Sequence, residues 1–472
     1  MISENTQTSS QLVRALKLRD LVLFNLVAVL GLRHLATSSQ FGPGSLVLWA
    51  IAALFFFIPQ GLAVIELSSR FPKEGGIYFW TKQALGEGHG FLCGWCYWIN
   101  NVLYYPNLLI SSAVIATYIF GQDKSGLSEQ WTYVLTATLI MLWFAVAINI
   151  VGAGTGKWLQ NAGGIGTYIP GAIIILLGLY GYLTADAANP INFVTLTPDL
   201  SNLGSLNLLS TVAFAFAGLE LSSTMGDEIE NPRRNLPRSV FISAPLIAGA
   251  YILGTASVLW LVPKSELNIV SGFLQAISLG ALNMSEHLWW VAPVCAALYT
   301  IGNIGGVGAW LIGPARVAFV IGLDRYFPRA FGAIHPRWHT PYVAILVQAV
   351  LATLFLGLAV QGEGTRVKDV YLILLDTQIL IYFIPYLYLF VVFVLHRRRG
   401  VNAEHAVLVP VAPWLLSIGG LAITLFAMVV ATIPPQDTPH PWQFRLKVIG
   451  GAAGFVLIGG LIYLRAKLRR PA

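Results

Sequence analysis

The sequence contains twelve long apolar runs joined by short polar connections, and these runs constrain the fold more than any other feature. They cover about residues 22–43, 46–70, 84–120, 131–151, 161–183, 208–227, 238–262, 289–322, 341–360, 370–395, 408–432 and 447–466. A helix needs about 20 apolar residues to cross a hydrocarbon core roughly 30 Å thick. The runs therefore predict an all-α, polytopic membrane protein with about twelve transmembrane helices, of which the third and eighth extend past the bilayer or tilt.

The composition agrees with a chain that lies almost entirely in a membrane. Charged residues make up 10% of the chain, whereas soluble proteins carry roughly 25%. We interpret residues 1–20 as a polar cytoplasmic tail with no cleavable signal peptide. Residues 21–470 are predicted to form a single transmembrane domain, because the connections between the runs are too short for a further domain.

Lysine and arginine are distributed unevenly over the connections. With the N-terminus placed in the cytoplasm, 21 of the 28 basic residues fall on the cytoplasmic side, six fall outside and Arg33 lies within a run. Cytoplasmic loops of membrane proteins carry an excess of Lys and Arg. The distribution predicts a multi-pass inner-membrane protein with both termini in the cytoplasm. It also explains the net charge of +7 without a nucleic-acid partner.

The sequence offers no pattern typical of a metal site, a cofactor site or a catalytic centre. Cys93 and Cys96 form a CxxC pair inside an apolar run, but no second pair completes a zinc site. The glycines near residue 305 follow no strand and lack the lysine of a phosphate-binding loop, so we interpret them as helix-packing residues. We predict no cofactor, no metal and no enzymatic activity.

Two runs are interrupted near their midpoints by residues that favour a break in the helix. The breaks lie at residues 31–36 in the first run and 214–220 in the sixth run. Non-helical backbone at membrane depth is tolerated where it lines a cavity, and in transporters paired breaks mark substrate sites between two repeats. The helix ends at such breaks expose unpaired N–H and C=O groups that attract a carboxylate and an ammonium group respectively. The alternative is a kink with packing glycines in each helix.

We therefore predict that the breaks bind the substrate, which we expect to be an amino acid or a related amine. The predicted contributors are Gly31, Leu32, Arg33, His34, Phe214, Ala217 and Gly218. Aromatic residues deep in the third and eighth runs are further pocket candidates. These are Tyr97, Trp98, Tyr104, Tyr105 and Trp310, with Tyr97, Tyr105 and Trp310 assigned to the predicted site.

Four ionisable residues lie deepest in the apolar runs: Arg33, His34, Glu220 and Asp376. Such groups usually face a cavity or one another. We predict that Glu220 and Asp376 act as proton-coupling or gate carboxylates. The alternative for Glu220 is a structural partner for a helix-end donor or for Arg33, and the alternative for Asp376 is a structural hydrogen bond. Arg33 either attracts an anionic group of the substrate or pairs with Glu220. His34 either responds to pH or is a hydrogen-bonded structural residue.

Three segments of the chain resemble the amino acid–polyamine–organocation superfamily of transporters. The segment from Ile65 to Trp98 is similar to the most recognisable block of that superfamily, with its Phe-Pro, Gly-Gly and Gly-Trp elements. The segment from Phe216 to Val240 is similar to its sixth-helix block, including the Glu-x-x-Asn-Pro element. The segment from Arg316 to Pro341 resembles the block that follows helix eight.

The resemblance implies a core of two inverted five-helix repeats, near residues 21–185 and 205–395, with two added helices near 408–470. It implies transport by alternating access, with substrate bound by the backbone at both breaks. It places Glu220 at a gate carboxylate that responds to pH, Phe214 at an aromatic gate and Trp310 at an aromatic pocket position.

The chain departs from the superfamily pattern at three places. The first break carries Leu32, Arg33 and His34 in place of small residues, which resembles the glutamate/GABA exchanger branch. Residues 161–183 contain no lysine, although some proton-coupled members carry one there. The Tyr104-Tyr105-Pro106 sequence is similar to polyamine carriers.

The leading hypothesis is secondary transport of amino acids or related amines by proton symport or exchange. The partners it implies are a small-molecule substrate, protons and the lipid bilayer. The alternatives are a polyamine transporter, or a channel or sensor built on the same fold. A channel or sensor would show ion flux or signalling without concentrative uptake.

Overall fold

The computed structural model describes most of the chain, and the statements below concern that part. The described residues are 14, 16–121, 126–151, 153–184, 187–198, 210–359, 366–402, 404, 406–435, 438 and 440–469. They form helices, short helical turns and loops, and no strand is assigned among them.

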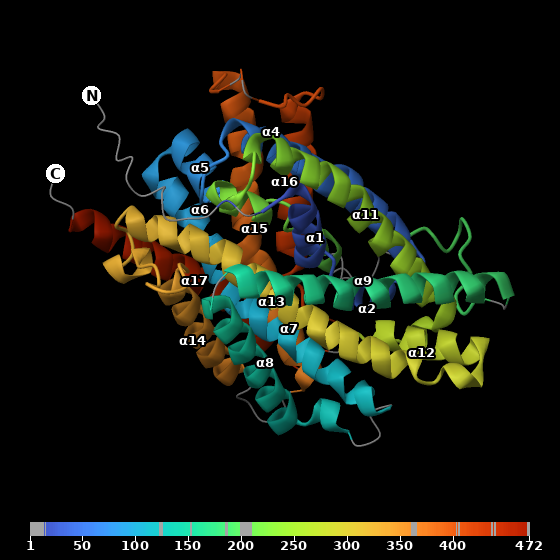
Figure 1. The fold of residues 1–472 in the computed structure, drawn as a ribbon. Helices are drawn as coiled ribbons and strands as arrows, with labels where there is room; N and C mark the ends of the chain where they lie inside the picture. The colour runs from blue at the N-terminus through green and yellow to red at the C-terminus, as the bar shows by residue number, and fades with distance from the viewer. Residues whose placement is uncertain are drawn as a thin grey trace.

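The helices follow one another along the whole chain (Figure 1). They are α1 (Leu18–Val29), α2 (Arg33–Ser39), α3 (Gly44–Ala52), α4 (Ile58–Arg70), α5 (Ile77–Leu85), α6 (Glu87–Ile99), α7 (Asn101–Ala116), α8 (Trp131–Val151), α9 (Ala153–Thr184), α11 (Pro232–Leu261), α12 (Gly272–Met284), α13 (Val291–Leu323), α14 (Tyr342–Ala359), α15 (Val367–Arg399), α16 (Pro413–Val430) and α17 (Pro441–Leu468). The π-helical turn η2 (Ala53–Phe57) joins α3 to α4, and the 3₁₀ helix η5 (Leu221–Glu228) precedes α11.

Most of the predicted runs correspond to helices that can cross a membrane. Nine described helical segments have the required length and apolar composition, and the bent pair α1–α2 makes a tenth. Of the other two predicted runs, 341–360 corresponds to the shorter α14, while 208–227 is broken and begins outside the described residues. The prediction of an all-α, polytopic membrane protein is confirmed.

Two short helices are not anticipated by the hydropathy pattern. The third run was expected to start near residue 84, but α5 occupies Ile77–Leu85 and ends at Gly86, whose φ of +91° breaks the helix before α6. The second is α12, which lies between α11 and α13 in the chain. Both helices are too short to span a bilayer.

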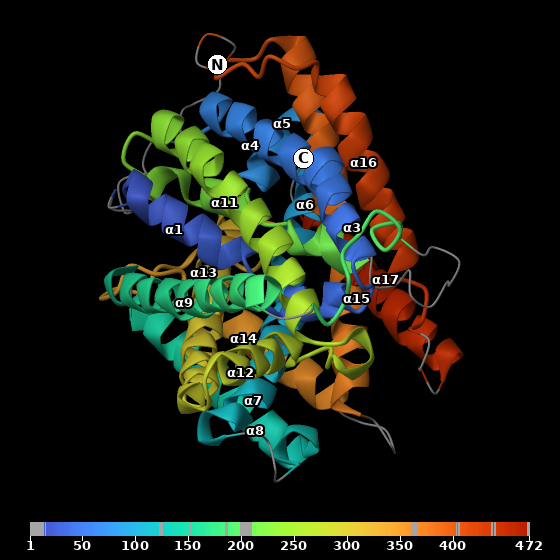
Figure 2. The same cartoon turned by 90° about the vertical axis from the view of Figure 1, so that its right-hand side faces the viewer.

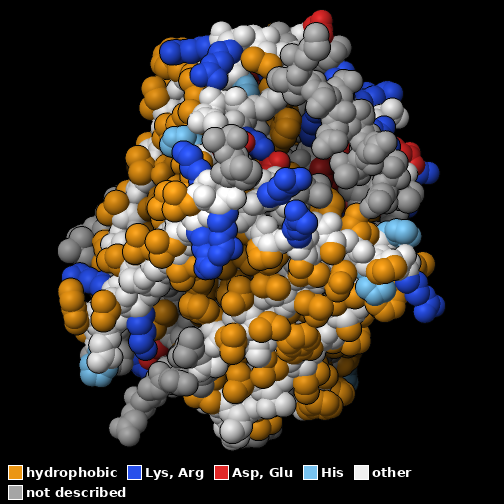
Figure 3. All heavy atoms as spheres, turned by 90° about the vertical axis from the view of Figure 1, so that its left-hand side faces the viewer, with side chains coloured by type: hydrophobic (Ala, Val, Ile, Leu, Met, Phe, Trp, Pro, Cys, Tyr) orange, Lys and Arg blue, Asp and Glu red, His pale blue; other side chains and the backbone are white. Residues whose placement is uncertain are grey.

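The outer surface of the helix bundle is apolar. Phe144 on α8, Leu354 on α14 and Leu457 on α17 are 53%, 59% and 67% exposed. Exposed apolar patches of this kind suit contact with lipid tails. Figure 3 shows apolar side chains over much of one face, with Lys and Arg gathered toward its upper and middle part. That face is the side on which both termini lie in Figure 1.

Glycine contacts hold α9 and α13 close together, and Figure 2 shows the two helices side by side. A Cβ atom on Gly305 would lie 2.5 Å from the Cα of Gly163, and one on Gly166 would lie 2.2 Å from the carbonyl oxygen of Leu298. Small residues let membrane helices approach backbone to backbone. The interpretation of the glycines near residue 305 as packing residues agrees with this contact.

The two segments with the strongest family resemblance pack against each other. The loop between α4 and α5 lies on η5, where the Gly75 N–H donates a 3.0 Å hydrogen bond to the carbonyl oxygen of Thr224. Gly76 has a φ of +42°, and a Cβ atom there would lie 2.7 Å from the Ser223 hydroxyl. Only glycine therefore fits at residue 76 without strain or displacement of η5.

A buried ion cluster lies at the same contact. The Arg316 guanidinium on α13 is 2.6 Å from a Glu228 carboxylate oxygen and 3.8 Å from Glu74 in the loop after α4. Burial raises the pKa of Glu74 well above its ordinary value, and the nearby Glu228 and Asp227 raise it further, while Arg316 lowers it. The cluster joins the loop after α4, η5 and α13 at one point.

We expect Gly76→Ala to lower the melting temperature of the purified protein by several degrees. The new methyl group would meet Ser223, and the backbone conformation would cost about 1–3 kcal/mol with a side chain. Gly249→Ala on α11 is the matched control, because no atom lies within 4 Å of the added methyl group. Equal melting temperatures for the two variants in detergent would contradict the proposed steric role.

The ion cluster predicts opposite effects for its two glutamates. Because the fold raises the pKa of Glu74, the native state binds more protons than the unfolded state above the ordinary pKa, and stability falls as the pH rises through this window. The stability of Glu74→Gln relative to the wild type should therefore increase as the pH is raised from about 5 to about 8.

Glu228→Gln should destabilise the protein by about 3–5 kcal/mol at every pH in that range, because it leaves Arg316 buried without its close partner. Thermal unfolding of both variants in detergent at the two pH values measures the difference. A greater loss of stability in Glu74→Gln than in Glu228→Gln would show that Glu74, and not Glu228, is the more important partner of Arg316.

Candidate substrate site at the two helix breaks

The first predicted break divides the first membrane segment into α1 and α2. α1 ends at Val29, Leu30 is extended with φ −74° and ψ 99°, and α2 begins at Arg33. The two helices are bent by 41°. The chain therefore leaves the helix at Leu30 and re-enters it three residues later.

The second break separates the helical residues 210–215 from η5. Residues 216–220 form turns, and Gly218 has a φ of +128°. A Cβ atom on Gly218 would lie 3.1 Å from Val29 and 3.3 Å from the Trp310 ring. The absence of a side chain at this glycine thus lets the second break approach the end of α1 and Trp310.

Tyr251 on α11 connects the two breaks, and the sequence analysis did not identify it. Its hydroxyl accepts a 2.9 Å hydrogen bond from the Gly31 N–H and lies 2.6 Å from the carbonyl oxygen of Val29 and 3.1 Å from that of Ala215. The ring stacks on Trp49 with centroids 4.4 Å apart. A single tyrosine within an apolar helix carries no sequence signal for this role, because its partners come from distant segments.

A cavity lies between the breaks and is lined by residues of both. The predicted site residues that line it are Gly31, Arg33, His34, Phe214, Ala217 and Trp310. Polar and aromatic residues that the site prediction did not include also line it, and these are Asn100, Tyr104, Thr167, Asn303, Gln378 and Tyr382. The two breaks and the third, eighth and tenth predicted runs therefore meet at one place.

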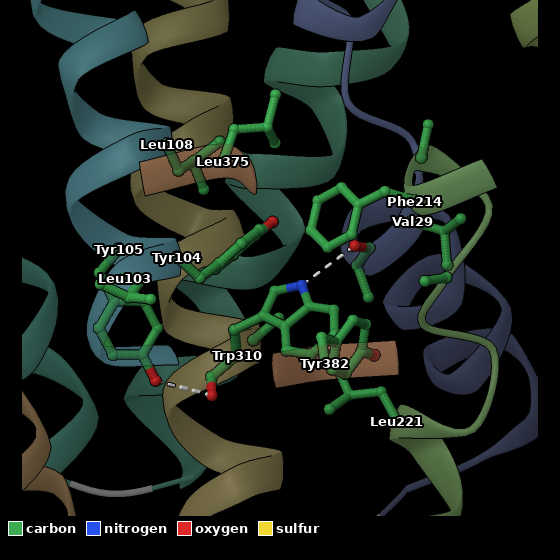
Figure 4. Packing of buried hydrophobic residues seen from close by; sticks show 14 of the residues in the cluster. Val29, Leu103, Tyr104, Tyr105, Leu108, Phe214, Leu221, Trp310, Leu375 and Tyr382 are labelled. Atoms are coloured by element: carbon green, nitrogen blue, oxygen red, sulfur yellow. Dashed lines mark hydrogen bonds between the residues drawn. The ribbon is translucent and has the colours of Figure 1, made fainter. Parts of the chain in front are cut away.

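Aromatic rings form much of the cavity wall. Figure 4 shows Tyr104, Phe214, Trp310 and Tyr382 converging on a common centre from different helices. Trp310 is the middle ring, with centroids 5.1 Å from Tyr104 and 5.7 Å from Tyr382. Its indole N–H donates to the carbonyl oxygen of Ala28, so the ring is held against the end of α1.

Six predicted site residues lie outside this lining, and one of them, Glu220, is described in the next paragraph. Leu32 is buried near α9, and Tyr105 lies behind Trp310, donating a 2.9 Å hydrogen bond to its carbonyl oxygen. Tyr97 packs on Tyr382 at 5.7 Å between centroids. Gly218 contributes the close approach described above, and Asp376 is buried on α15 without lining the cavity.

Glu220 follows the second break and is fully buried. The hydroxyls of Tyr382 and Tyr386 each donate a 2.6 Å hydrogen bond to its carboxylate, and the Gln60 amide donates a third at 3.1 Å. Tyr386 also accepts a 2.7 Å hydrogen bond from the Gly218 N–H. The carboxylate is thus linked to the break through Tyr386 and to the cavity wall through Tyr382.

Arg33 and Glu220 do not form an ion pair. The Glu220 carboxylate is bound by the uncharged donors just described, and Arg33 lies over the Tyr104 ring with its guanidinium carbon 5.5 Å from the centroid. Of the two alternatives that the sequence left open for Arg33, pairing with Glu220 is therefore excluded.

Comparison with known proteins identifies the family of the chain. The sequence profile of the amino acid permease family matches residues 17–453. The chain belongs to the amino acid permease family. A permease of this family is a membrane transporter rather than an enzyme, and its relatives imply small-molecule substrates such as amino acids or amines.

Three relatives match the permease over most of their length. An uncharacterized transporter of Legionella pneumophila is 31% identical over 94% of this chain and 96% of its own. A probable agmatine/putrescine antiporter of Lactococcus lactis is 24% identical over 88% of each chain. A glutamate/γ-aminobutyrate antiporter of the same species is 24% identical over 84% of this chain and 80% of its own.

We expect Tyr251→Phe to lower both stability and transport. The substitution leaves the Gly31 N–H and nearby carbonyl oxygens buried without their shared partner, at a cost of about 1–3 kcal/mol. Tyr168→Phe is the matched control, because its hydroxyl also donates to an α1 carbonyl oxygen, that of Leu23, away from the breaks.

Melting temperature and the initial rate of amino acid uptake into proteoliposomes test this pair of variants. Both should lose some stability, whereas a large loss of uptake is expected for Tyr251→Phe alone. Similar uptake by the two variants would mean that Tyr251 does not support the site.

Proposed function

We propose that this permease carries out secondary active transport of amino acids or related amines by alternating access, with proton symport or substrate exchange. It acts in the bacterial inner membrane with both termini in the cytoplasm, as the distribution of basic residues predicts. The substrate binds in the cavity between the two breaks, whose lining includes the aromatic rings of Phe214 and Trp310.

One observation carries the proposal: beside the second break lies a buried carboxylate whose hydrogen-bond donors, among the described residues, are all uncharged. A carboxylate that is locked by an arginine or lysine rarely takes up a proton, because the cation stabilises its charged form. The partners of Glu220 are two tyrosine hydroxyls and an amide, and none of them carries charge. The absence of a cation among these partners supports the proposal that Glu220 exchanges a proton during transport.

Protonation of Glu220 would act on the break through its hydrogen bonds. A protonated carboxyl group has an O–H that needs an acceptor, so one of the tyrosine hydroxyls must turn or move. Tyr386 also binds the backbone of Gly218, and Tyr382 forms part of the cavity wall. A change of charge at Glu220 thus alters both the second break and the cavity wall.

Two forms of coupling remain within the proposal, and exchange is the form that the named relatives favour. Both Lactococcus relatives carry the word antiporter in their names. Uptake that requires substrate inside the vesicle identifies exchange, and uptake that requires an inward proton gradient identifies symport. Ion flux without accumulation would instead indicate a channel.

We expect Glu220→Gln to abolish the pH dependence of uptake while the protein stays folded. The glutamine side chain keeps the size of the glutamate and can still accept a tyrosine hydrogen bond, but it cannot exchange a proton. The measurement is uptake of radiolabelled amino acids into proteoliposomes across a range of pH.

The matched control is Glu266→Gln. It removes an exposed carboxylate whose position in the sequence is remote from the residues that line the cavity. This control should keep the pH profile of the wild type. An unchanged profile in Glu220→Gln would remove Glu220 from the coupling mechanism while leaving the transport function intact.

A further inference from the structure

Within the described part of the chain, Arg33 differs from the other buried arginines in having no carboxylate partner. In the described part of the chain three arginines are at least 95% buried: Arg33, Arg70 and Arg316. Arg70 lies 2.8 Å from Glu66, and Arg316 lies 2.6 Å from Glu228. Among the described residues no carboxylate oxygen lies within the 4.0 Å ion-pair distance of the Arg33 guanidinium.

Burial of an unpaired charge is costly, so such a group usually has a partner in the working protein. The Tyr104 ring supplies part of the compensation through a cation–π contact. The Arg33 Nε, however, is buried without a hydrogen-bond partner. Because Arg33 lines the cavity, a bound ligand has direct access to this charge.

A second polar group in the cavity also lacks a partner. Gln378 on α15 is fully buried and lines the cavity, and neither its amide nitrogen nor its amide oxygen makes a hydrogen bond to a described residue. Asn100 likewise lines the cavity with an unpartnered side-chain oxygen. Buried polar atoms are normally satisfied, so unpartnered atoms at a cavity indicate where a ligand or water binds.

Glu220 does not neutralise Arg33 from across the cavity wall. Its carboxylate oxygens are occupied by Tyr382, Tyr386 and Gln60. The His34 side chain, which also lines the cavity, lies against Phe214 and Tyr251 and adds no negative charge. The lining residues therefore present one permanent charge to the substrate, and it is positive.

We propose that the substrate is an amino acid with an acidic side chain, and that Arg33 is the specificity residue that pairs with its second carboxylate. The inference rests on the transport function proposed above and names its substrate class. A neutral amino acid carries one ammonium and one carboxylate, so it leaves Arg33 without a counter-charge. An acidic amino acid brings one negative charge in excess, while a diamine brings two positive charges against Arg33.

Arginine suits this task because its planar guanidinium binds a carboxylate through two parallel hydrogen bonds. Lysine would supply the charge without that geometry. The amide of Gln378 can donate to the same carboxylate or accept from the substrate ammonium. The site should therefore discriminate against an amino acid whose side chain carries an amide in place of the carboxylate, because that substrate leaves the Arg33 charge buried and unpaired.

The test compares radiolabelled glutamate with radiolabelled glutamine, which have nearly the same shape. Purified full-length protein in proteoliposomes is loaded with unlabelled glutamate or glutamine, and uptake is measured at neutral pH, with putrescine as a third probe. The wild type should take up glutamate at least about tenfold faster than glutamine, and putrescine more slowly than either.

Three variants separate the role of Arg33 from a general effect on the protein. Arg33→Gln should lower the ratio of glutamate to glutamine uptake at least about tenfold, and Arg33→Lys should retain part of the preference. Arg233→Gln, which removes an exposed arginine at the start of α11, should keep the wild-type ratio.

The wild-type ratio decides the question even when a variant fails to fold. Faster uptake of glutamine or putrescine than of glutamate would overturn the acidic-substrate proposal while leaving the transport function in place. An unchanged ratio in a folded Arg33→Gln would overturn the role of Arg33. If the protein takes up none of the three probes and no other amino acid or amine, the proposed function itself is overturned.

Discussion

The two helix breaks can exist at membrane depth because side chains from other helices bind the backbone groups that the breaks expose. Lipid offers no hydrogen bonds, so each N–H and C=O that leaves a helix needs a partner within the protein. Tyr251 binds the end of α1 at Val29 and Gly31, and Trp310 binds it at Ala28. Tyr386 binds the second break at Gly218. The cavity, and every role proposed for it, depends on these contacts.

The side chains that bind the backbone at the breaks also contact other parts of the site, so they connect the breaks to the cavity wall and to Glu220. Trp310 holds α1 and also forms the cavity wall. Tyr386 holds Gly218 and also donates to the Glu220 carboxylate. A change in substrate or in protonation therefore reaches the backbone of a break through one side chain. Such short links offer a physical route by which binding and gating influence each other.

Buried charged groups in the described part of the chain fall into two kinds, those with an oppositely charged partner and those without one. At the end where the family-like segments meet, buried charges are paired, as Arg316 is with Glu228. At the cavity the two charged groups do not pair: Arg33 lines the cavity and contacts an aromatic ring, whereas Glu220 does not line it and is bound by uncharged donors. A buried charge without a counter-charge is costly, which makes each of these two groups a candidate for binding a proton or a ligand. The distinction is what makes the cavity a candidate site rather than a packing defect.

Hydropathy, basic-residue placement and the two breaks are local patterns, and the sequence by itself determined them. Length and apolar composition require helices in a bilayer, and Gly31 and Gly218 both lie at the breaks, where Gly218 has a φ of +128°. The pattern did not anticipate α5 or α12, because short helices leave no membrane-length run.

Tertiary structure alone decided which distant residues meet. Nothing in the sequence near Tyr251 or Gln378 distinguishes them from other residues of their helices, yet the first joins both breaks and the second lines the cavity. The same holds for Arg33, for which the sequence left open either an anionic substrate group or Glu220 as the partner. Hydrogen bonds of Glu220 to residues more than 150 positions away in the sequence exclude the pairing with Glu220. Such contacts depend on how helices pack, and no local periodicity encodes them.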